Sequence, residues 1–160
     1  MFDNYLLFNL TEMKKILVLL VAACAILVSC QKENPLKKSD DVCRKMEDAA
    51  FKSFCYDNFD SNHDGTISTK EAADVKTITC KGYNITSIKG IEFFTEITQL
   101  DCSHNNLSSL DLSKNTKLKS LDCSYNNLTS LDVSKNTLLE YFIYNPQNTG
   151  KYIIPTGWDK

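Results

Sequence analysis

The sequence has little of what catalysis and nucleic-acid binding require. It contains only two histidines, His63 and His104, and has no nucleophile elbow, phosphate-binding glycine loop or pair of catalytic carboxylates outside one acidic loop at residues 60–71. Its 18 basic and 20 acidic residues give a net charge of −2, with no basic cluster beyond short lysine pairs. An apolar run at residues 16–29 is shorter than the ~20 residues of a membrane-spanning helix. We therefore expect neither an enzyme nor a nucleic-acid-binding protein.

An internal repeat dominates the second half of the chain. Residues 101–121 align with residues 122–142 without a gap, and 14 of the 21 positions are identical. A fixed period in the twenties is typical of repeat proteins in which each copy supplies one strand and a return segment. Both copies follow the spacing L-x-x-L-x-L-x-x-N-x-L. Its constrained positions are Ile97, Leu100, Cys102, Asn105 and Leu107 in one copy, and Leu118, Leu121, Cys123, Asn126 and Leu128 in the next.

This spacing resembles that of the leucine-rich-repeat family. The resemblance implies an α+β fold, a short right-handed leucine-rich-repeat solenoid with parallel strands on its concave face. An imperfect copy lies 22 residues upstream, with Tyr83 in place of the asparagine, and the pattern stops downstream at Pro146. The repeats therefore occupy residues 77–145, about three and a half copies, which is close to the minimum for a stable array. Other segments must close both ends.

Two kinds of residue should line up along the array. Where the chain leaves each strand, backbone groups lose their sheet partners, and stacked Asn105 and Asn126 side chains can satisfy them. Cys80, Cys102 and Cys123 share one core position in successive repeats, so they should stack ~4.8 Å apart. Thiols in a line cannot surround zinc tetrahedrally. We expect them to act as small apolar side chains.

A helical pattern precedes the acidic loop. Apolar residues recur at spacings of three and four, which predicts one helix from Asp41 to Phe59 and, after the loop, a second from Thr69 to about Lys76. Cys43 and Cys55 are twelve positions apart. On a single helix they would lie about 18 Å apart, so we expect both thiols to be free.

The loop between these helices resembles the EF-hand calcium loop. Asp60, Asn62 and Asp64 stand at positions 1, 3 and 5, Gly65 at position 6 permits the sharp turn, and Glu71 closes the loop at position 12. The resemblance implies a Ca²⁺ site whose oxygen ligands are Asp60, Asn62, Asp64, Thr66 through its carbonyl, Ser68 and Glu71. A loop that keeps this shape without an ion is the alternative.

Only one such loop is present, and few residues separate it from the first repeat. Residues 41–76 therefore resemble the internalin-type cap, an EF-hand-like helical unit that covers the first leucine-rich repeat. Such caps commonly lack calcium ligands, as the resemblance implies, whereas this loop retains them. We expect calcium to be structural, fixing two helices over the exposed edge of the array. A calcium-dependent surface adhesin or envelope structural protein, whose ligand binding is gated by calcium, is the alternative.

The N-terminal residues predict export. Two lysines precede an apolar run that ends in Leu27–Cys30, which resembles a bacterial lipobox. The resemblance implies a lipoprotein signal peptide at residues 13–29, lipid on Cys30, and a bacterial envelope protein anchored by that lipid, facing either the periplasm or the outside. An ordinary secretion signal with a chance cysteine is the alternative.

The segments on either side of this signal have simpler interpretations. Residues 1–12 bring Asp3 and Glu12 ahead of it, whereas a signal peptide begins with a positive end. We therefore expect translation to start at Met13, with residues 1–12 absent from the protein. Residues 30–40 are polar and lack an apolar period, so we expect them to be a linker.

The outward side chains of the strands form the concave face, where repeat proteins of this kind bind partners. The candidate partner-binding residues are Gln99, Asp101, Ser103, His104, Ser120, Asp122, Ser124 and Tyr125. They suit a protein or peptide ligand with a polar or basic surface, and a merely solvated face is the alternative. Residues 146–160 should cover the last repeat. The sequence thus predicts a lipid-anchored, calcium-binding, monomeric leucine-rich-repeat protein that serves as an interaction module.

Overall fold

The computed structural model describes residues 40–150 and 153–158. The predicted signal peptide (13–29), the lipid site Cys30, the linker before residue 40 and residues 1–12 lie outside the described residues. Within the described part, no helix has the length and apolar character needed to cross a membrane.

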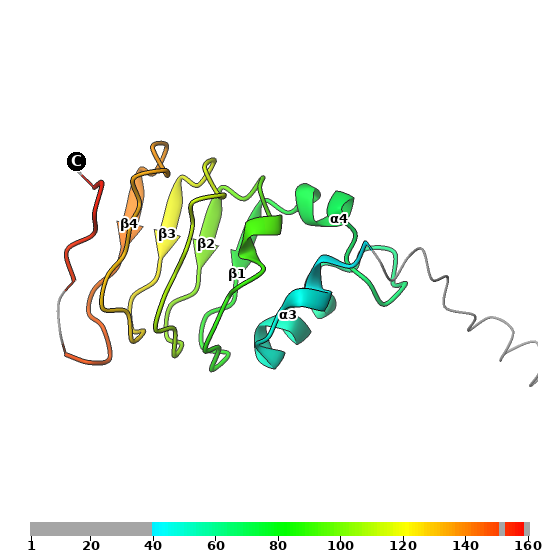
Figure 1. Cartoon of the computed structure of the whole chain (residues 1–160), viewed down its shortest axis with the longest axis horizontal. Coiled ribbons are helices and arrows are strands. Elements are labelled where there is room, and N and C mark those ends of the chain that lie inside the picture. Colours follow the sequence, from blue (N-terminus) through cyan, green and yellow to red (C-terminus); the bar gives the residue numbers. More distant parts are fainter. Residues whose placement is uncertain (1–39, 151–152, 159–160) are drawn as a thin grey trace, which may run out of the picture. The chain divides into compact units, whose positions relative to one another are not determined.

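A parallel sheet of four short strands organises the described chain (Figure 1). The strands are β1 (Thr77–Thr79), β2 (Gln99–Asp101), β3 (Ser120–Asp122) and β4 (Tyr141–Ile143), and they pair in chain order. Thr77 pairs with Gln99, Gln99 with Ser120, and Ser120 with Tyr141. These offsets are the predicted repeat lengths. The α+β leucine-rich-repeat architecture is therefore confirmed.

Alternation along each strand divides inward from outward residues, as the spacing predicts. The central residues Ile78, Leu100 and Leu121 are buried. Cys80, Cys102 and Cys123 follow their strands in the same core position, and all three are fully buried. One repeat cannot bury these residues alone, so the core is shared between neighbouring repeats.

Asn105 and Asn126 form the expected ladder. Asn105 Oδ1 accepts a hydrogen bond from Ile85 N (3.0 Å), and its Nδ2 donates to the carbonyls of Cys80 and Cys102 (2.8 and 3.0 Å). Asn126 repeats the pattern, accepting from Leu107 N and donating to the carbonyl of Cys102. Both asparagines are almost fully buried. Each side chain thus satisfies backbone groups of its own repeat and of the preceding one.

A second ladder lies on the return segments, and the repeat spacing L-x-x-L-x-L-x-x-N-x-L does not include its asparagines. Asn115 and Asn136 are buried. Asn115 Nδ2 donates to the carbonyls of Ile91 and Phe94, at a short 3₁₀ helix, η2 (Ile91–Phe93). Asn136 Nδ2 donates to the carbonyls of Leu112 and Asn115 one repeat later. The array is therefore tied together on both sides of its core.

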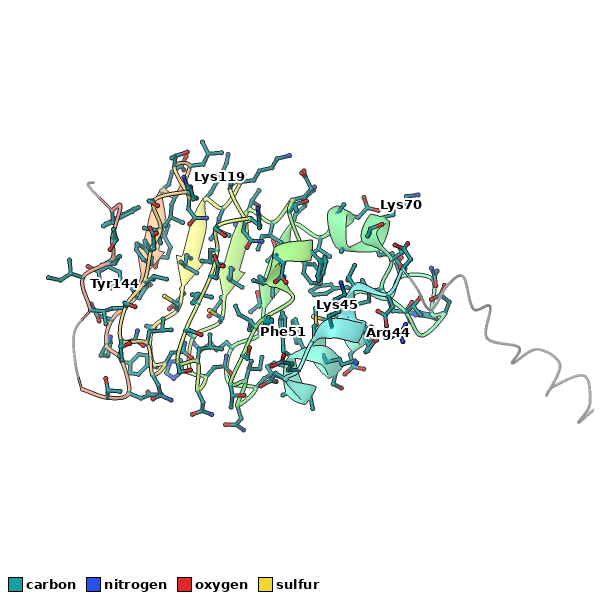
Figure 2. The ribbon with its side chains drawn as sticks, in the orientation of Figure 1. Arg44, Lys45, Phe51, Lys70, Lys119 and Tyr144 are labelled. Carbon is teal, nitrogen blue, oxygen red and sulfur yellow. The ribbon has the colours of Figure 1, made fainter. Side chains whose placement is uncertain are left out.

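The last repeat is closed by the residues that follow β4. Gln147 lies 21 positions after Asn126 and takes over the ladder, since its Oε1 accepts a hydrogen bond from Leu128 N at 3.0 Å. The ring of Trp158 contacts that of Phe142 edge-on, with centroids 5.1 Å apart. Thr156 pairs with the backbone of residues 131–133. Figure 2 shows Tyr144 at this end of the sheet.

The N-terminal unit lies at the β1 end of the sheet (Figure 1). It consists of a 3₁₀ helix, η1 (Val42–Lys45), and two α-helices, α3 (Ala49–Phe59) and α4 (Thr69–Asp74). The prediction of one helix from Asp41 to Phe59 is wrong, because Met46 is extended and Asp48 caps α3 by accepting a hydrogen bond from Phe51 N. The predicted separation of Cys43 and Cys55 is also wrong. The chain folds back at the break, so the two buried thiols are in hydrogen-bond contact, which raises the pKa of Cys55 far above its usual value.

Aromatic side chains pack this unit onto the first repeat. Phe51 is fully buried and lies on the side of α3 toward the repeats (Figure 2). The ring of Phe54 contacts that of Tyr83 edge-on at a centroid distance of 5.1 Å. Phe59 contacts Phe94 at 5.5 Å. Tyr83, which replaces the ladder asparagine in the first repeat, therefore meets the cap instead of a preceding repeat.

Asp48 joins the cap to the first repeat through both carboxylate oxygens. Oδ1 caps α3, while Oδ2 accepts hydrogen bonds from Thr86 N (2.8 Å), Thr86 Oγ1 (2.6 Å) and Ser87 N (3.2 Å). Partial burial raises the pKa of Asp48, but these hydrogen bonds outweigh it and hold the pKa below the usual value. The ionised carboxylate is therefore the form that the fold stabilises.

We predict that Asp48→Asn lowers the free energy of unfolding by about 1–3 kcal/mol at neutral pH, because the amide presents a donor to Thr86 and Ser87. A group with a depressed folded pKa stabilises the fold above its unfolded pKa and loses that contribution as the pH falls through the folded pKa. The difference from wild type should thus shrink below about pH 4. Denaturant unfolding over this pH range measures it. Asp57→Asn, whose carboxylate accepts a hydrogen bond from Ser53 Oγ on the same helix, is the control, and an equal loss in it would contradict the bridge.

Candidate functional site

The concave face carries the candidate partner-binding residues, and the structure separates them into three groups. Gln99, His104 and Tyr125 are exposed, while Ser120 and the two aspartates are half-buried. Ser103 and Ser124 were expected to face outward, and this is wrong, since both are buried. The alternation fails there because the chain has already left the strand and begun its turn.

The buried serines position the aspartates. Ser103 N and Oγ donate to Asp101 Oδ1 at 3.0 and 2.6 Å, and Ser124 makes the same two bonds to Asp122 Oδ1. Asp101 and Asp122 are register partners on adjacent strands. The two carboxylates therefore stand side by side in fixed orientations.

His104 and Tyr125 form a stacked pair beside the strand ends. Their ring centroids are 4.3 Å apart and the rings are inclined by 12°. Both residues have a positive φ, 55° and 53°. This left-handed conformation is unfavourable for residues other than glycine, and Gly82 takes it in the first repeat. The turn thus presents two large rings at a position where the backbone favours glycine.

The acidic loop follows α3 and has the hydrogen bonds of a tight turn. Asp60 accepts from Asp64 N and Gly65 N, and Asn62 Oδ1 accepts from Asp64 N. Gly65 has a φ of 78°. Ile67 in this loop is fully buried, and its carbonyl accepts a hydrogen bond from Val42 N at the start of η1, at 2.9 Å.

Glu71 closes the loop by hydrogen bonds. Its Oε1 accepts from Ser61 N, Ser61 Oγ and Asn62 N, and its Oε2 accepts from Ser68 N and Ser68 Oγ, at 2.9–3.3 Å. Burial raises the pKa of Glu71, but these bonds from Ser68, Ser61 and Asn62 keep the pKa below its usual value. Ser68 and Glu71 also form a capping box at the start of α4. The loop is therefore ordered by its own side chains.

The chemistry of the loop suits Ca²⁺, which takes six to eight hard oxygens. Asp60, Asn62, Asp64 and Glu71 supply such oxygens, and Thr66 and Ser68 add a carbonyl and a hydroxyl. In the described chain, no three His, Cys, Asp or Glu side chains are grouped so as to hold a metal ion. The residue types therefore fit calcium, while an ion would have to draw Glu71 away from hydrogen bonds that it already makes.

The three stacked cysteines, Cys80, Cys102 and Cys123, have thiols that are poorly reactive as nucleophiles. Burial raises the pKa of Cys80 and Cys123 to about 12, and burial together with the neighbouring thiols raises that of Cys102 well above its usual value. All three side chains are fully buried. They are core residues.

Comparisons with known proteins agree with this fold. No family model matches the sequence. Over 58 residues the chain is 39% identical to internalin J of Listeria monocytogenes serotype 4b, a stretch that covers 36% of this chain and 6% of the relative. The chain thus spans a small fraction of that protein's length.

Solved internalin structures are among those that this chain resembles. The functional domain of InlJ from Listeria monocytogenes, described as including a cysteine ladder, has a TM-score of 0.51 and 41% identity over 51% of this chain and 18% of that one. An internalin, inlF, from the same species has a TM-score of 0.58 and 22% identity over 67% of this chain and 32% of that one, which supports the fold alone. The chain is therefore internalin-like, with short parallel strands and an N-terminal helical cap. The likeness to these repeat proteins supports the prediction that the chain is not an enzyme.

We predict that the thiols of Cys80, Cys102 and Cys123 react with iodoacetamide at pH 8 about a thousandfold more slowly in the folded protein than in short peptides, since only the thiolate is nucleophilic. Quenched labelling followed by peptide mass spectrometry measures each cysteine separately. The same thiols should label fully in denaturant. Labelling of Cys102 at the peptide rate in the folded protein would contradict its place in the core.

Proposed function

We propose that this internalin-like leucine-rich-repeat protein is a binding module of the bacterial cell envelope, which recognises a protein or peptide through its concave face. The observation that carries the proposal is the sheet itself. Four parallel strands in register present a continuous set of outward side chains, including exposed Gln99 and Tyr141, and exposed Tyr125 follows β3 in the adjoining turn. Rigid presentation of such a set is how repeat arrays bind partners.

Attachment to the envelope rests on the N-terminal residues. The apolar run followed by Leu27–Cys30 supports a lipoprotein signal with lipid on Cys30. The likeness to internalin J, a protein of Listeria monocytogenes, supports a bacterial surface protein.

We also propose a structural calcium ion in the acidic loop. Donor chemistry at alternate positions, the positive φ of Gly65 and the exposure of Asn62 and Asp64 support it. The loop adjoins η1 and α3 through Ile67 and Asp41, since Asp41 Oδ1 accepts from Ile67 N and its Oδ2 from Tyr56 Oη. An ion here would stiffen the cap. Within the described residues the hydrogen bonds of the loop stay inside the cap, so a gating role has no support of its own.

The interaction module is tested by site-specific photocrosslinking in cells. A photoreactive amino acid at Gln99 or Ser120 should give adducts with an envelope partner, since both lie on the concave face. Matched positions on the return segments, Ser109 and Ser130, are exposed controls. Adducts from the return segments but not from the strands would overturn the proposed face.

We predict that Cys30→Ala releases the protein from the membrane fraction into the soluble fraction, because lipid attachment needs that thiol. Cell fractionation and mass determination of the mature N-terminus measure it. Cys24→Ala, which alters another cysteine of the leader, should leave the protein in the membrane. Continued sedimentation of the Cys30 variant with membranes would contradict the lipid anchor.

We predict that calcium at a hundredfold excess over its Kd raises the free energy of unfolding by about 2.7 kcal/mol, with a Kd of ~10⁻⁴–10⁻³ M as in extracellular modules. Thermal unfolding in calcium and in chelator measures the shift, and it should be the same with or without a binding partner. In Glu71→Gln the calcium-dependent shift should vanish, while in Asp74→Asn, beyond the loop, it should persist. Identical melting temperatures of the wild type in calcium and in chelator would contradict the proposal of a structural calcium ion.

A further inference from the structure

The two aspartates of the concave face place two carboxylates next to each other on adjacent strands. Asp101 and Asp122 are register partners, and neighbouring strands lie ~4.8 Å apart. Like charges directly opposite each other repel. The serines fix Oδ1 of each carboxylate, and within residues 40–150 and 153–158 no hydrogen bond is donated to either Oδ2. The fold therefore holds two parallel carboxylates with one oxygen of each open to a ligand.

The surroundings favour a cation. An open depression on this face is lined by the outward residues of all four strands, among them Thr77, Gln99, Ser120 and Tyr141 beside the two aspartates. Across residues 77–79, 99–101, 120–122 and 141–143 the only charged side chains are these aspartates. Tyr141 is 58% exposed, so its ring face is open to a guanidinium, which aromatic rings attract.

Resting on the proposed function, we infer that the depression receives an arginine side chain of the protein partner. A planar guanidinium has donors in a rigid fork, which can bridge the Oδ2 oxygens of Asp101 and Asp122 while its flat side lies against Tyr141. Charge-assisted bonds of this kind are the strong ones. A bare calcium ion is disfavoured here, because calcium takes six to eight oxygens and the lining of the depression supplies only the two carboxylates of Asp101 and Asp122.

The test uses the whole protein and a short capped peptide with one central arginine among serines and threonines. A second peptide carries citrulline, which has the shape of arginine without its charge. Backbone NMR shifts at Gln99–Asp101 and Ser120–Asp122 follow binding. The arginine peptide should bind about tenfold more tightly than the citrulline peptide, since hydrogen bonds to charged groups exceed neutral ones by that order.

A matched pair of charge-removing variants locates the effect. Asp101→Asn with Asp122→Asn should abolish the preference for arginine. The control pair, Asp111→Asn with Asp132→Asn, removes the same charge from the return segments. Each of these aspartates likewise accepts a hydrogen bond from the backbone amide of a serine two positions later. The control pair should leave the preference for arginine intact. If the first pair fails to fold, the two peptides on wild type still decide the matter.

The inference is overturned if wild type binds both peptides equally or neither, or if both double variants lose the preference alike. Failure of the inference is distinguishable from failure of the proposed function. Crosslinks at Gln99 and Ser120 that persist while arginine gives no advantage would leave the concave face as an interaction surface and remove only its cationic ligand.

Discussion

Backbone hydrogen bonding at the strand ends is the constraint on which this structure depends. Each strand is only three residues long, so the turns that follow contain backbone groups with no partner within the strands. A buried polar group without a partner costs about 1–3 kcal/mol. Asn105, Asn126 and Gln147 remove that cost, since each amide side chain bonds the backbone of its own repeat and of the one before. The repeats stack because this bonding requires a neighbour.

The same requirement explains the two ends of the array. The first repeat has no earlier neighbour, so Tyr83 replaces the asparagine and packs on Phe54, while the Asp48 carboxylate takes the amides of Thr86 and Ser87. At the last repeat, Gln147 accepts a hydrogen bond from Leu128 N, and Thr156 of the closing segment pairs with Asp132. Contacts therefore close both ends of the array. Between them, the serine hydrogen bonds hold the two aspartates side by side on the concave face.

Periodicity predicted the parts of the fold that repeat, and it did less well where the chain stops repeating. Residues 101–142 determined the strand register and the asparagine ladder, because a burial pattern that recurs leaves one arrangement. The break at Met46 was missed, since spacings of three and four continue through it, although Asp48 three residues before Phe51 is an N-cap signal. Gln147 was also missed because Pro146 obscured the spacing of 21. The residue types of the calcium loop could be recognised, and the ion stays a prediction because Glu71 already has hydrogen-bond partners.

Amide hydrogen exchange of the whole protein tests the ladder most directly. Ile85, Leu107 and Leu128 donate their backbone N–H groups to Asn105, Asn126 and Gln147, respectively. We expect these three amides to exchange only through global unfolding, at rates that track the stability of the entire array. The amide of exposed Asn84 gives the reference rate. Exchange of the three ladder amides as fast as that of Asn84, under conditions in which the protein remains folded, would contradict the account.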